Sequence, residues 1–303
     1  MINKSVAQIC AVAAVVALPT LSWAGTASSK SKPVPAPEKL QESAITGDIG
    51  LNVVTAYYYH GSIQQNHSAS FQPYADINFK AFEGDGFLNK ATINIGIWNS
   101  LTNPATSTSP SGNGLWNSPK SWVESDFTPG VSLTFGKVTL TESYQFMFFP
   151  NSSTLETSES LVSKLAFDDS DILGAFALHP SITHQHEISG KAALSNSDAA
   201  LGGVNSGHRG NYWEAAVAPS IAAGPVTVTL PVTLGFGSSK YYKEDGYGYL
   251  SAGVNLGYAI PMPKQYGVWT ANLGGTYYNV NKSAVGGNAD NDVVGNLGLG
   301  ITF

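Results

Sequence analysis

The chain has 303 residues, a formal net charge of −6 and a charged fraction of only 12%. That fraction is about half of the roughly 25% usual in soluble domains, and the acidic balance argues against the basic surface of a nucleic-acid-binding protein. The mean hydropathy is close to zero, at −0.03. Such values suit strands that have one apolar face and one uncharged polar face.

The first 24 residues predict a secretory signal peptide. Lys4 supplies a basic start, residues 9–18 form an apolar run, and the small residues Ser22 and Ala24 favour cleavage after Ala24. The run is shorter than the ~20 residues of a membrane-spanning helix. The single cysteine, Cys10, lies inside this signal, so we expect neither disulfides nor thiolate chemistry in the mature chain.

Residues 25–45, with Pro33, Pro35 and Pro37, predict a flexible periplasmic segment. From there to Phe303 the sequence predicts one all-β domain, an antiparallel transmembrane β-barrel of about 12 strands, each near the ~9–11 residues needed to cross a bilayer. The expected strands are residues 46–60, 69–82, 90–100, 122–135, 137–149, 156–168, 171–183, 211–223, 225–237, 247–260, 267–279 and 292–303.

The connections between these segments alternate in length. Those after the even-numbered strands are short, with only Asp169 and Ser170 after the sixth, whereas most of the others are longer and polar. Short periplasmic turns, long external loops and an even strand count are typical of an outer-membrane barrel. We therefore expect an outer-membrane location with both termini in the periplasm.

Period-two parity separates an apolar set that would face lipid from a polar set that would line the lumen. Glu142 is an exception, because it shares the apolar face with Leu140 and Tyr144. It predicts a bulge or a different register in the strand at residues 137–149. The residues expected to line the lumen are Asp48, Tyr58, Tyr74, Asp76, Lys80, Trp98, Lys164, Glu214 and Tyr249.

The lumen charges in this set are few and of both signs, without the ring or ladder of one sign that a selective filter uses. We expect a narrow, weakly selective passage in which Tyr58, Tyr74, Trp98 and Tyr249 offer stacking surfaces to sugars. The alternative is an interior closed by its own side chains, because a barrel of about twelve strands lies between filled and open sizes. Aromatic residues gather at both ends of the expected strands, which predicts two interfacial girdles.

The last eight residues alternate strictly, with apolar side chains at every second position up to Phe303. These residues contain a short motif with a polar, a glycine, an apolar and an aromatic position, which are filled in that order by Asn296, Gly298, Ile301 and Phe303. This motif resembles the C-terminal β-signal of bacterial outer-membrane barrels. The resemblance implies that these four residues are an assembly signal read by the barrel-assembly machinery.

A second motif lies at residues 57–64, Tyr-Tyr-Tyr-His-Gly-Ser-Ile-Gln. It is similar to the first-strand signature of the TorF-type porin family, which reads Tyr, any, Phe, Arg, Gly, any two, Gln. Tyr57, Gly61 and Gln64 match, while Tyr59 replaces the Phe and His60 replaces the Arg. Phe71-Gln72 and residues 96–100 resemble that family's second and third strands. The resemblance implies an outer-membrane barrel that forms a pore.

Residues 179–187 form the richest polar cluster. His184 and His186 would share one side of a strand and could bind a transition metal, but we interpret them as part of a solvated loop tip. His179 and Ser181 resemble the His-any-Ser pairing of the outer-membrane phospholipase, although parity would turn them inward. No metal or other cofactor is expected.

The sequence thus predicts a porin-like channel for passive diffusion of small hydrophilic solutes, with outer-membrane lipid around it and no enzymatic activity. One alternative is a closed structural barrel that binds a partner through external loops, chiefly residues 101–121 and 184–210. A lipid-hydrolysing barrel is a more distant one. The solute, the ion selectivity and the oligomeric state stay open.

Overall fold

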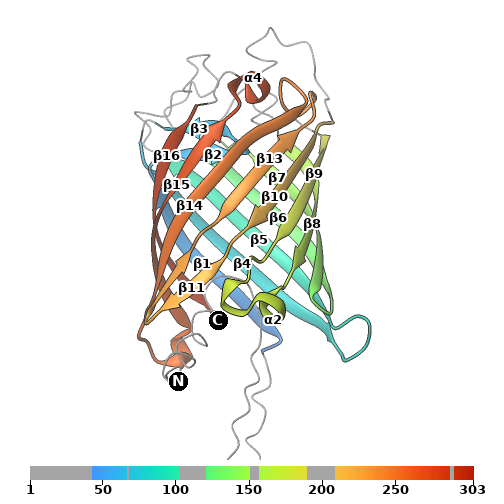
Figure 1. Ribbon diagram of the computed structural model, residues 1–303, viewed down its shortest axis with the longest axis vertical. Helices are drawn as coiled ribbons and strands as arrows, with labels where there is room; N and C mark the ends of the chain where they lie inside the picture. Colours follow the sequence, from blue (N-terminus) through green and yellow to red (C-terminus); the bar gives the residue numbers. More distant parts are fainter. Residues whose placement is uncertain (1–42, 67, 103–120, 151–156, 190–208, 287–289) are drawn as a thin grey trace, which may run out of the picture.

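A computed structural model describes residues 43–66, 68–102, 121–150, 157–189, 209–286 and 290–303. The expected signal peptide and most of the segment at residues 25–45 lie outside this part of the chain. The structure is 69% strand and 6% helix and forms a closed, 12-stranded antiparallel β-barrel, as predicted (Figure 1). Within the described ranges, no helix is long and apolar enough to cross a membrane.

Twelve wall strands are built from fourteen segments, because two of the wall strands are interrupted. The wall segments are β1 Ile45–Val54, β4 Ser70–Glu83, β5 Lys90–Thr102, β6 Trp122–Phe135, β7 Val138–Phe148, β8 Ser158–Phe167, β9 Ser181–Ser189, β10 Asn211–Val217, β11 Ser220–Ala223, β12 Val226–Thr229, β13 Val232–Gly237, β14 Gly246–Ile260, β15 Val268–Val280 and β16 Asp292–Thr302.

Proline explains both interruptions. The strand expected at 211–223 is divided into β10 and β11 at Pro219, and the strand expected at 225–237 is divided into β12 and β13 at Pro231. A proline cannot donate to the ladder between strands. The two breaks face each other, because the Leu230 amide donates to the Pro219 carbonyl over 2.9 Å.

Each wall strand pairs with its neighbour in the chain, and β16 closes the barrel by pairing with β1. Their register runs from Asp48 opposite Thr302 to Val54 opposite Asn296. It continues past the strand end, since Gly47 and Phe303 exchange backbone hydrogen bonds of 2.9 and 3.0 Å. The C-terminal residues thus complete the wall.

The predicted alternation of faces is present in the wall. In β1, Ile49 and Leu51 are 45% and 41% exposed on the outer surface. Between them, Gly50 faces inward, where the Tyr74 phenol lies so close that a Cβ on Gly50 would be 2.6 Å from its oxygen. Because the outer surface is apolar and every wall strand is paired, the barrel satisfies the two demands that hydrocarbon makes of a spanning structure.

The seventh strand was predicted wrongly at 171–183. Residues 170–176 instead form a short helix α2, Ser170–Leu173, and a 3-10 turn η3, Gly174–Phe176, and strand β9 begins only at Ser181. The connection after the sixth strand therefore spans residues 168–180, not just Asp169 and Ser170. Ile172 and Phe176 imitate a strand in the sequence, yet they are 64% and 79% exposed.

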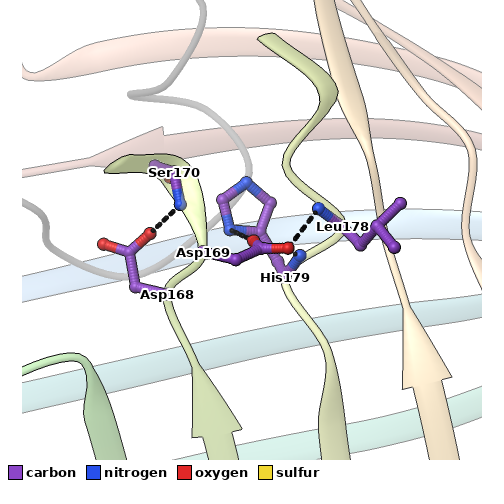
Figure 2. A network of polar contacts seen from close by, with 5 residues as sticks. All are labelled: Asp168, Asp169, Ser170, Leu178 and His179. Carbon is purple, nitrogen blue, oxygen red and sulfur yellow. Dashed lines mark hydrogen bonds and ion pairs between the residues drawn. The ribbon is translucent and has the colours of Figure 1, made fainter. Parts of the chain in front are cut away.

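Asp169 holds this connection in place (Figure 2). Its two carboxylate oxygens accept the backbone amides of Leu178 and His179, each over 2.9 Å. Burial raises the pKa of the Asp169 carboxyl, but these amide bonds outweigh it and leave the pKa below its usual value. His179 has a positive φ of 49°, so the chain reverses here before β9 begins.

Glu142 faces outward with no bulge in its strand, so both explanations offered by the sequence are wrong. The register of β7 is continuous on both sides, with Glu142 opposite Val131 of β6 and Ser163 of β8. Val131 is 43% exposed on the outer face. A hydrogen bond of 2.7 Å from the Ser163 hydroxyl satisfies the Glu142 carboxylate on this apolar surface.

Candidate functional site in the barrel lumen

The first predicted strand is shorter than expected, and the residues that follow it fold into the barrel. β1 ends at Val54, and the chain then forms a hairpin of β2, Tyr57–Tyr59, and β3, Ser62–Gln65, near the upper end of the barrel (Figure 1). Here "upper" denotes the end that carries α4, Lys282–Val285, and "lower" the end that carries α2 and the C-terminus. The motif that resembles the TorF signature is therefore this inner hairpin and not a wall strand.

The hairpin contacts several sides of the wall at once. On one side, Tyr57 donates to the Glu124 carboxylate of β6 over 3.1 Å, and its ring lies 5.1 Å from that of Trp98 in β5. On another side, the Tyr58 ring stacks on Tyr278 of β15 at 4.4 Å. Because β5 and β15 lie on opposite sides of the seam between β1 and β16, these contacts place the hairpin across the lumen.

The turn of the hairpin, His60 and Gly61, is enclosed by tyrosines. The His60 imidazole stacks between the rings of Tyr59 and Tyr212, with centroid distances of 4.0 and 3.7 Å. Its Nδ1 is hydrogen-bonded to the Tyr241 hydroxyl. Burial lowers the pKa of His60 from its ordinary 6.5 to about 3. His60 is therefore neutral at physiological pH.

Both turn residues have a backbone that suits this position. His60 and Gly61 have positive φ values of 49° and 85°, as expected for the two central residues of a tight hairpin turn. A side chain on Gly61 would also collide with Tyr249, because a Cβ there would lie 2.9 Å from a ring carbon. Tyr242 donates to the His60 carbonyl over 2.8 Å and holds the turn in place.

Around this turn the upper lumen is filled by a cluster of aromatic side chains, which we call the tyrosine cluster. Glu214 of β10 lies at its base and accepts hydrogen bonds from the hydroxyls of Tyr212 and Tyr249, over 2.9 and 3.2 Å. The cluster contacts the partly buried rings of the hairpin and of β15. Its buried members are Tyr212, Tyr241, Tyr242, Tyr249, Val280 and Val285.

Beside the hairpin lies a cavity of about 450 Å³. Hairpin residues 57–59 line it, together with Trp98, Asp126, Asn255 and Tyr278 of the wall. Two oxygens of its lining residues, Asp126 Oδ1 and Asn255 Oδ1, are buried away from the open space and have no hydrogen-bond partner among the described residues. The cavity thus has walls of aromatic and uncharged polar side chains, with Asp126 as the one acidic residue among those that line it.

The lower half of the lumen is different, because the side chains expected to line it are mostly charged and partly exposed. Tyr74 reaches over Gly50 and donates weakly to Asp48 over 3.4 Å. Asp76 pairs in register with Asp48, Lys80 forms an ion pair of 2.7 Å with Glu83, and Lys164 is exposed opposite Thr141 and Thr183.

The structure therefore divides the expected lumen residues into two groups. Tyr58, Trp98, Glu214 and Tyr249 gather around the hairpin, where Tyr58 comes from the hairpin itself. Asp48, Tyr74, Asp76, Lys80 and Lys164 lie along the inner wall below it. Their role in lining a passage stays a prediction.

Glu124 and Asp126 were missed, although a signal for them exists. Parity places both on the inner face of the strand predicted at 122–135, together with Thr128 and Gly130. The sequence also contains a signal for the hairpin. Tyr57, Tyr58 and Tyr59 are three successive tyrosines, which do not show the alternation of apolar and polar residues expected between lipid and lumen. Their assignment to a wall strand was therefore wrong.

The three histidines lie apart from the lumen site. His184 and His186 share one side of β9, as predicted, but they belong to a wall strand and not to a loop tip. Both rings contact Asn211 Oδ1, over 3.0 and 2.9 Å, and His184 stacks on the exposed Trp213. Within the described ranges, no group of three or more His, Cys, Asp or Glu residues could hold a metal ion.

His179 and Ser181 do not form the pair that parity suggested. His179 lies before β9 in a left-handed backbone conformation, where strand parity does not apply. Its Nδ1 lies 3.8 Å from Asp169 Oδ1 (Figure 2). On the outer face, the Ser163 hydroxyl donates to the Glu142 carboxylate over 2.7 Å.

No protein-family model and no curated protein matches the chain. Among solved structures, it is similar to the NanC porin at 13% identity, covering 84% of this chain and 98% of that one with a TM-score of 0.43. An outer membrane channel from Pseudomonas putida F1 is similar at 8% identity, covering 90% of this chain and 100% of that one, with a TM-score of 0.48. The chain is also similar to the dimeric outer membrane phospholipase of Salmonella typhi with bound calcium, at 12% identity. That match covers 88% of this chain and 94% of that one, with a TM-score of 0.43.

All three TM-scores are below 0.5, so the fold assignment rests on the strand pairing of the chain itself. The resemblance to TorF-type porins likewise stays a prediction.

Proposed function

We propose that this protein is an outer-membrane, porin-like channel for passive diffusion of small hydrophilic solutes, with the hairpin β2–β3 as its constriction. The observation that carries the proposal is the division of the lumen into a polar lower half and a narrowed upper half that still holds a cavity of about 450 Å³. Outer-membrane barrels have a polar interior, which is a water-filled channel in porins and is plugged by a loop or a helix in others.

The wall supports the membrane location in this proposal. Its outer surface carries large apolar side chains such as Ile97, Leu256 and Leu297, which are 45%, 39% and 58% exposed. Such a surface suits lipid, and closure leaves no unpaired edge. We place the lower end in the periplasm, with both termini, and assign Asn296, Gly298, Ile301 and Phe303 to recognition by the barrel-assembly machinery.

One observation favours a second candidate, a closed barrel that acts through its external loops. The tyrosine cluster and the hairpin together occupy the upper lumen, and Tyr212, Tyr241 and Tyr242 are nearly fully buried. If the hairpin never moves and leaves no passage beside it, the barrel is a scaffold. The loops concerned lie largely outside the described residues.

Planar-bilayer recording separates the two candidates. The mature protein is refolded, its folding is verified by circular dichroism and heat-modifiable mobility, and single-channel currents are recorded. Discrete conductance steps are expected, together with entry of small neutral sugars into protein-containing vesicles. Silence from correctly folded protein would overturn the channel and leave the scaffold.

A further inference from the structure

We infer that the cavity beside the hairpin binds a neutral sugar, with the sugar ring against an aromatic side chain and its hydroxyl groups on the polar part of the wall. The inference rests on the proposed channel function and deepens it, because it names the class of solute. The site itself is defined by the cavity, so its occupancy can be measured without any conductance.

The size and position of the cavity suit a small organic solute. Its volume of about 450 Å³ falls within the range of ordinary ligand sites. Its walls come from the hairpin and from both sides of the barrel seam, with Trp98 on β5 and Asn255 on β14. A ligand here would contact the constriction and the wall together.

Aromatic rings from three parts of the molecule border the cavity. Trp98 of β5, Tyr58 of the hairpin and Tyr278 of β15 line it, and all three are only partly buried. Trp98 meets the buried Tyr57 ring at 48° with centroids 5.1 Å apart, so these two rings are tilted and do not cover each other face to face. Trp98 faces the lumen, and its exposed surface therefore offers a solute an aromatic contact.

The rest of the polar wall both donates and accepts hydrogen bonds. The carboxamides of Gln72, Asn255 and Asn296 line the cavity together with the Thr276 hydroxyl. A carboxamide carries two N–H donors and a carbonyl acceptor, and a hydroxyl group has both functions. The hydroxyl groups of a sugar have both functions too, so they match this wall.

The charges around the cavity do not favour an ion. No Lys, Arg or His is among the described residues that line it, and Asp126 is the one acidic residue among them. The Asp126 carboxyl is 8% exposed and is hydrogen-bonded to Gln145 and to the Glu124 carboxyl. An ion would lose part of its hydration here without gaining a charged partner, whereas a neutral solute avoids that cost.

The combination of rings and carboxamides distinguishes a sugar from other neutral solutes. A hydrocarbon would cover the rings but leave the carboxamides without partners, which is costly. A linear polyol would pair with the carboxamides, but it has no ring face and loses more conformational freedom on binding. A pyranose carries an apolar C–H face and a rim of hydroxyl groups on one rigid ring.

The test compares methyl β-D-glucopyranoside with sorbitol, an open-chain polyol of similar size. Binding is measured by saturation-transfer NMR with the full mature protein folded in lauryldimethylamine oxide, a detergent without a sugar head group. Saturable transfer to the ring C–H protons of the glycoside is expected, with little transfer to sorbitol. Equal transfer to both molecules, or none to the glycoside, would overturn the inference.

Two variants locate the site. Trp98→Leu is expected to weaken glycoside binding about fivefold, as the loss of one aromatic contact would. Trp213→Leu makes the same change on the outer face, where Trp213 is 49% exposed, and is expected to leave the affinity nearly unchanged. An equal loss in both variants would contradict the assigned site.

If Trp98→Leu does not fold, Tyr278→Leu removes a ring from the other side of the seam and is expected to weaken binding. Unchanged affinity in a folded Tyr278→Leu variant would count against the site. The comparison of the two probes with the wild-type protein decides the inference even if neither variant folds. Binding without conductance would overturn the channel and keep the site, and conductance without binding would do the reverse.

Discussion

The wall of the barrel and the hairpin inside it are both antiparallel β structure, yet their side chains follow different rules. In β1, exposed Ile49 and Leu51 alternate with residues that face the lumen. In the hairpin, the neighbours Ser62 and Ile63 have opposite parity, yet they are only 7% and 6% exposed. A strand between lipid and lumen must alternate, whereas a hairpin enclosed on both faces is free of that constraint.

The largest effect is expected from breaking the wall at its C-terminal residue. Phe303→Asp, or deletion of Phe303, places a charge or a gap where the aromatic ring lies over Gly47 at the closing seam. We expect loss of the folded barrel from the outer-membrane fraction, measured by heat-modifiable mobility. Phe87→Asp is the matched control, because Phe87 is 88% exposed in a lower connection, and that variant should assemble. Normal assembly of Phe303→Asp would contradict the role of this residue in assembly.

The second effect separates the hairpin from the wall that supports it. At Gly235 a Cβ would lie 2.2 Å from a Tyr249 ring carbon, so Gly235→Ala must displace a tyrosine that touches the hairpin turn. Overpacking of this kind costs about 1–3 kcal/mol. We expect faster hydrogen exchange of the amides at residues 57–65, with the wall amides unchanged.

Gly86→Ala provides the control for this variant, because a Cβ at Gly86 meets nothing within 4 Å. Its exchange rates should equal those of the wild type. If Gly235→Ala also left the hairpin amides unchanged, the tyrosine cluster would not be what holds the hairpin.

A third effect concerns pH. The pKa of His60 in the docked hairpin is about 3, against its ordinary 6.5, so the docked state binds fewer protons between these values. Docking is therefore most stable above about pH 6.5 and weakens as the pH falls toward 3. The rings that face His60 are the phenols of Tyr59, Tyr212 and Tyr241, which stay neutral in acid.

We expect the conductance to rise as the pH falls from 7 to 4.5, and we expect this rise to shrink in His60→Gln. Because buried carboxyl groups nearby also titrate, the difference between the two proteins is the quantity that reports on His60. An identical pH dependence in both would show that another group controls the hairpin.

The smallest effect tests a charged exception on the apolar outer face of the wall. Replacing Glu142 with Leu removes a carboxylate from the apolar outer face, where a charge costs less than the ~2–4 kcal/mol measured for Arg or Lys. We expect the free energy of unfolding in lipid vesicles to rise by about 1 kcal/mol. Ser163→Ala removes the hydroxyl that satisfies Glu142 and should lower it instead. A destabilised Glu142→Leu variant would show that the pair supports the wall.

The same comparison explains what the sequence could predict. The strand expected at 122–135 matches β6 at both ends. Those expected at 247–260 and 292–303 differ from β14 and β16 by one residue at one end, and the one expected at 267–279 is shifted by one residue from β15. These strands face lipid on one side along their length, so their pattern is strict. Closure between the first and last strands followed from the even count.

The errors lie in the connections, where no such constraint acts. Residues 57–60 were merged with the first strand because their aromatic side chains suit a girdle as well as a buried cluster. The apolar residues Ile172 and Phe176 were taken for a strand because burial cannot be inferred from apolarity alone. The carboxylate of Asp169 and the backbone of His179, which set the true start of β9, depend on contacts ten residues apart.

The candidate site was predicted only in part for the same reason. Tyr58, Trp98, Glu214 and Tyr249 were expected to face inward from the wall, but their meeting point is the hairpin turn at His60 and Gly61. Parity could have added Glu124 and Asp126. It could not have shown that Tyr57 reaches Glu124 across the lumen, since that contact depends on a loop folding inward.

The most direct test of the hairpin as a constriction is to remove it. Residues 57–65 are replaced by a short Gly-Ser linker, which keeps Thr55 and its hydrogen bonds to Gly295 of β16. Single-channel conductance is then compared with that of the intact protein under the same salt conditions. We predict a folded barrel with a severalfold larger conductance. An equal conductance from a correctly folded variant would contradict the hairpin as the constriction.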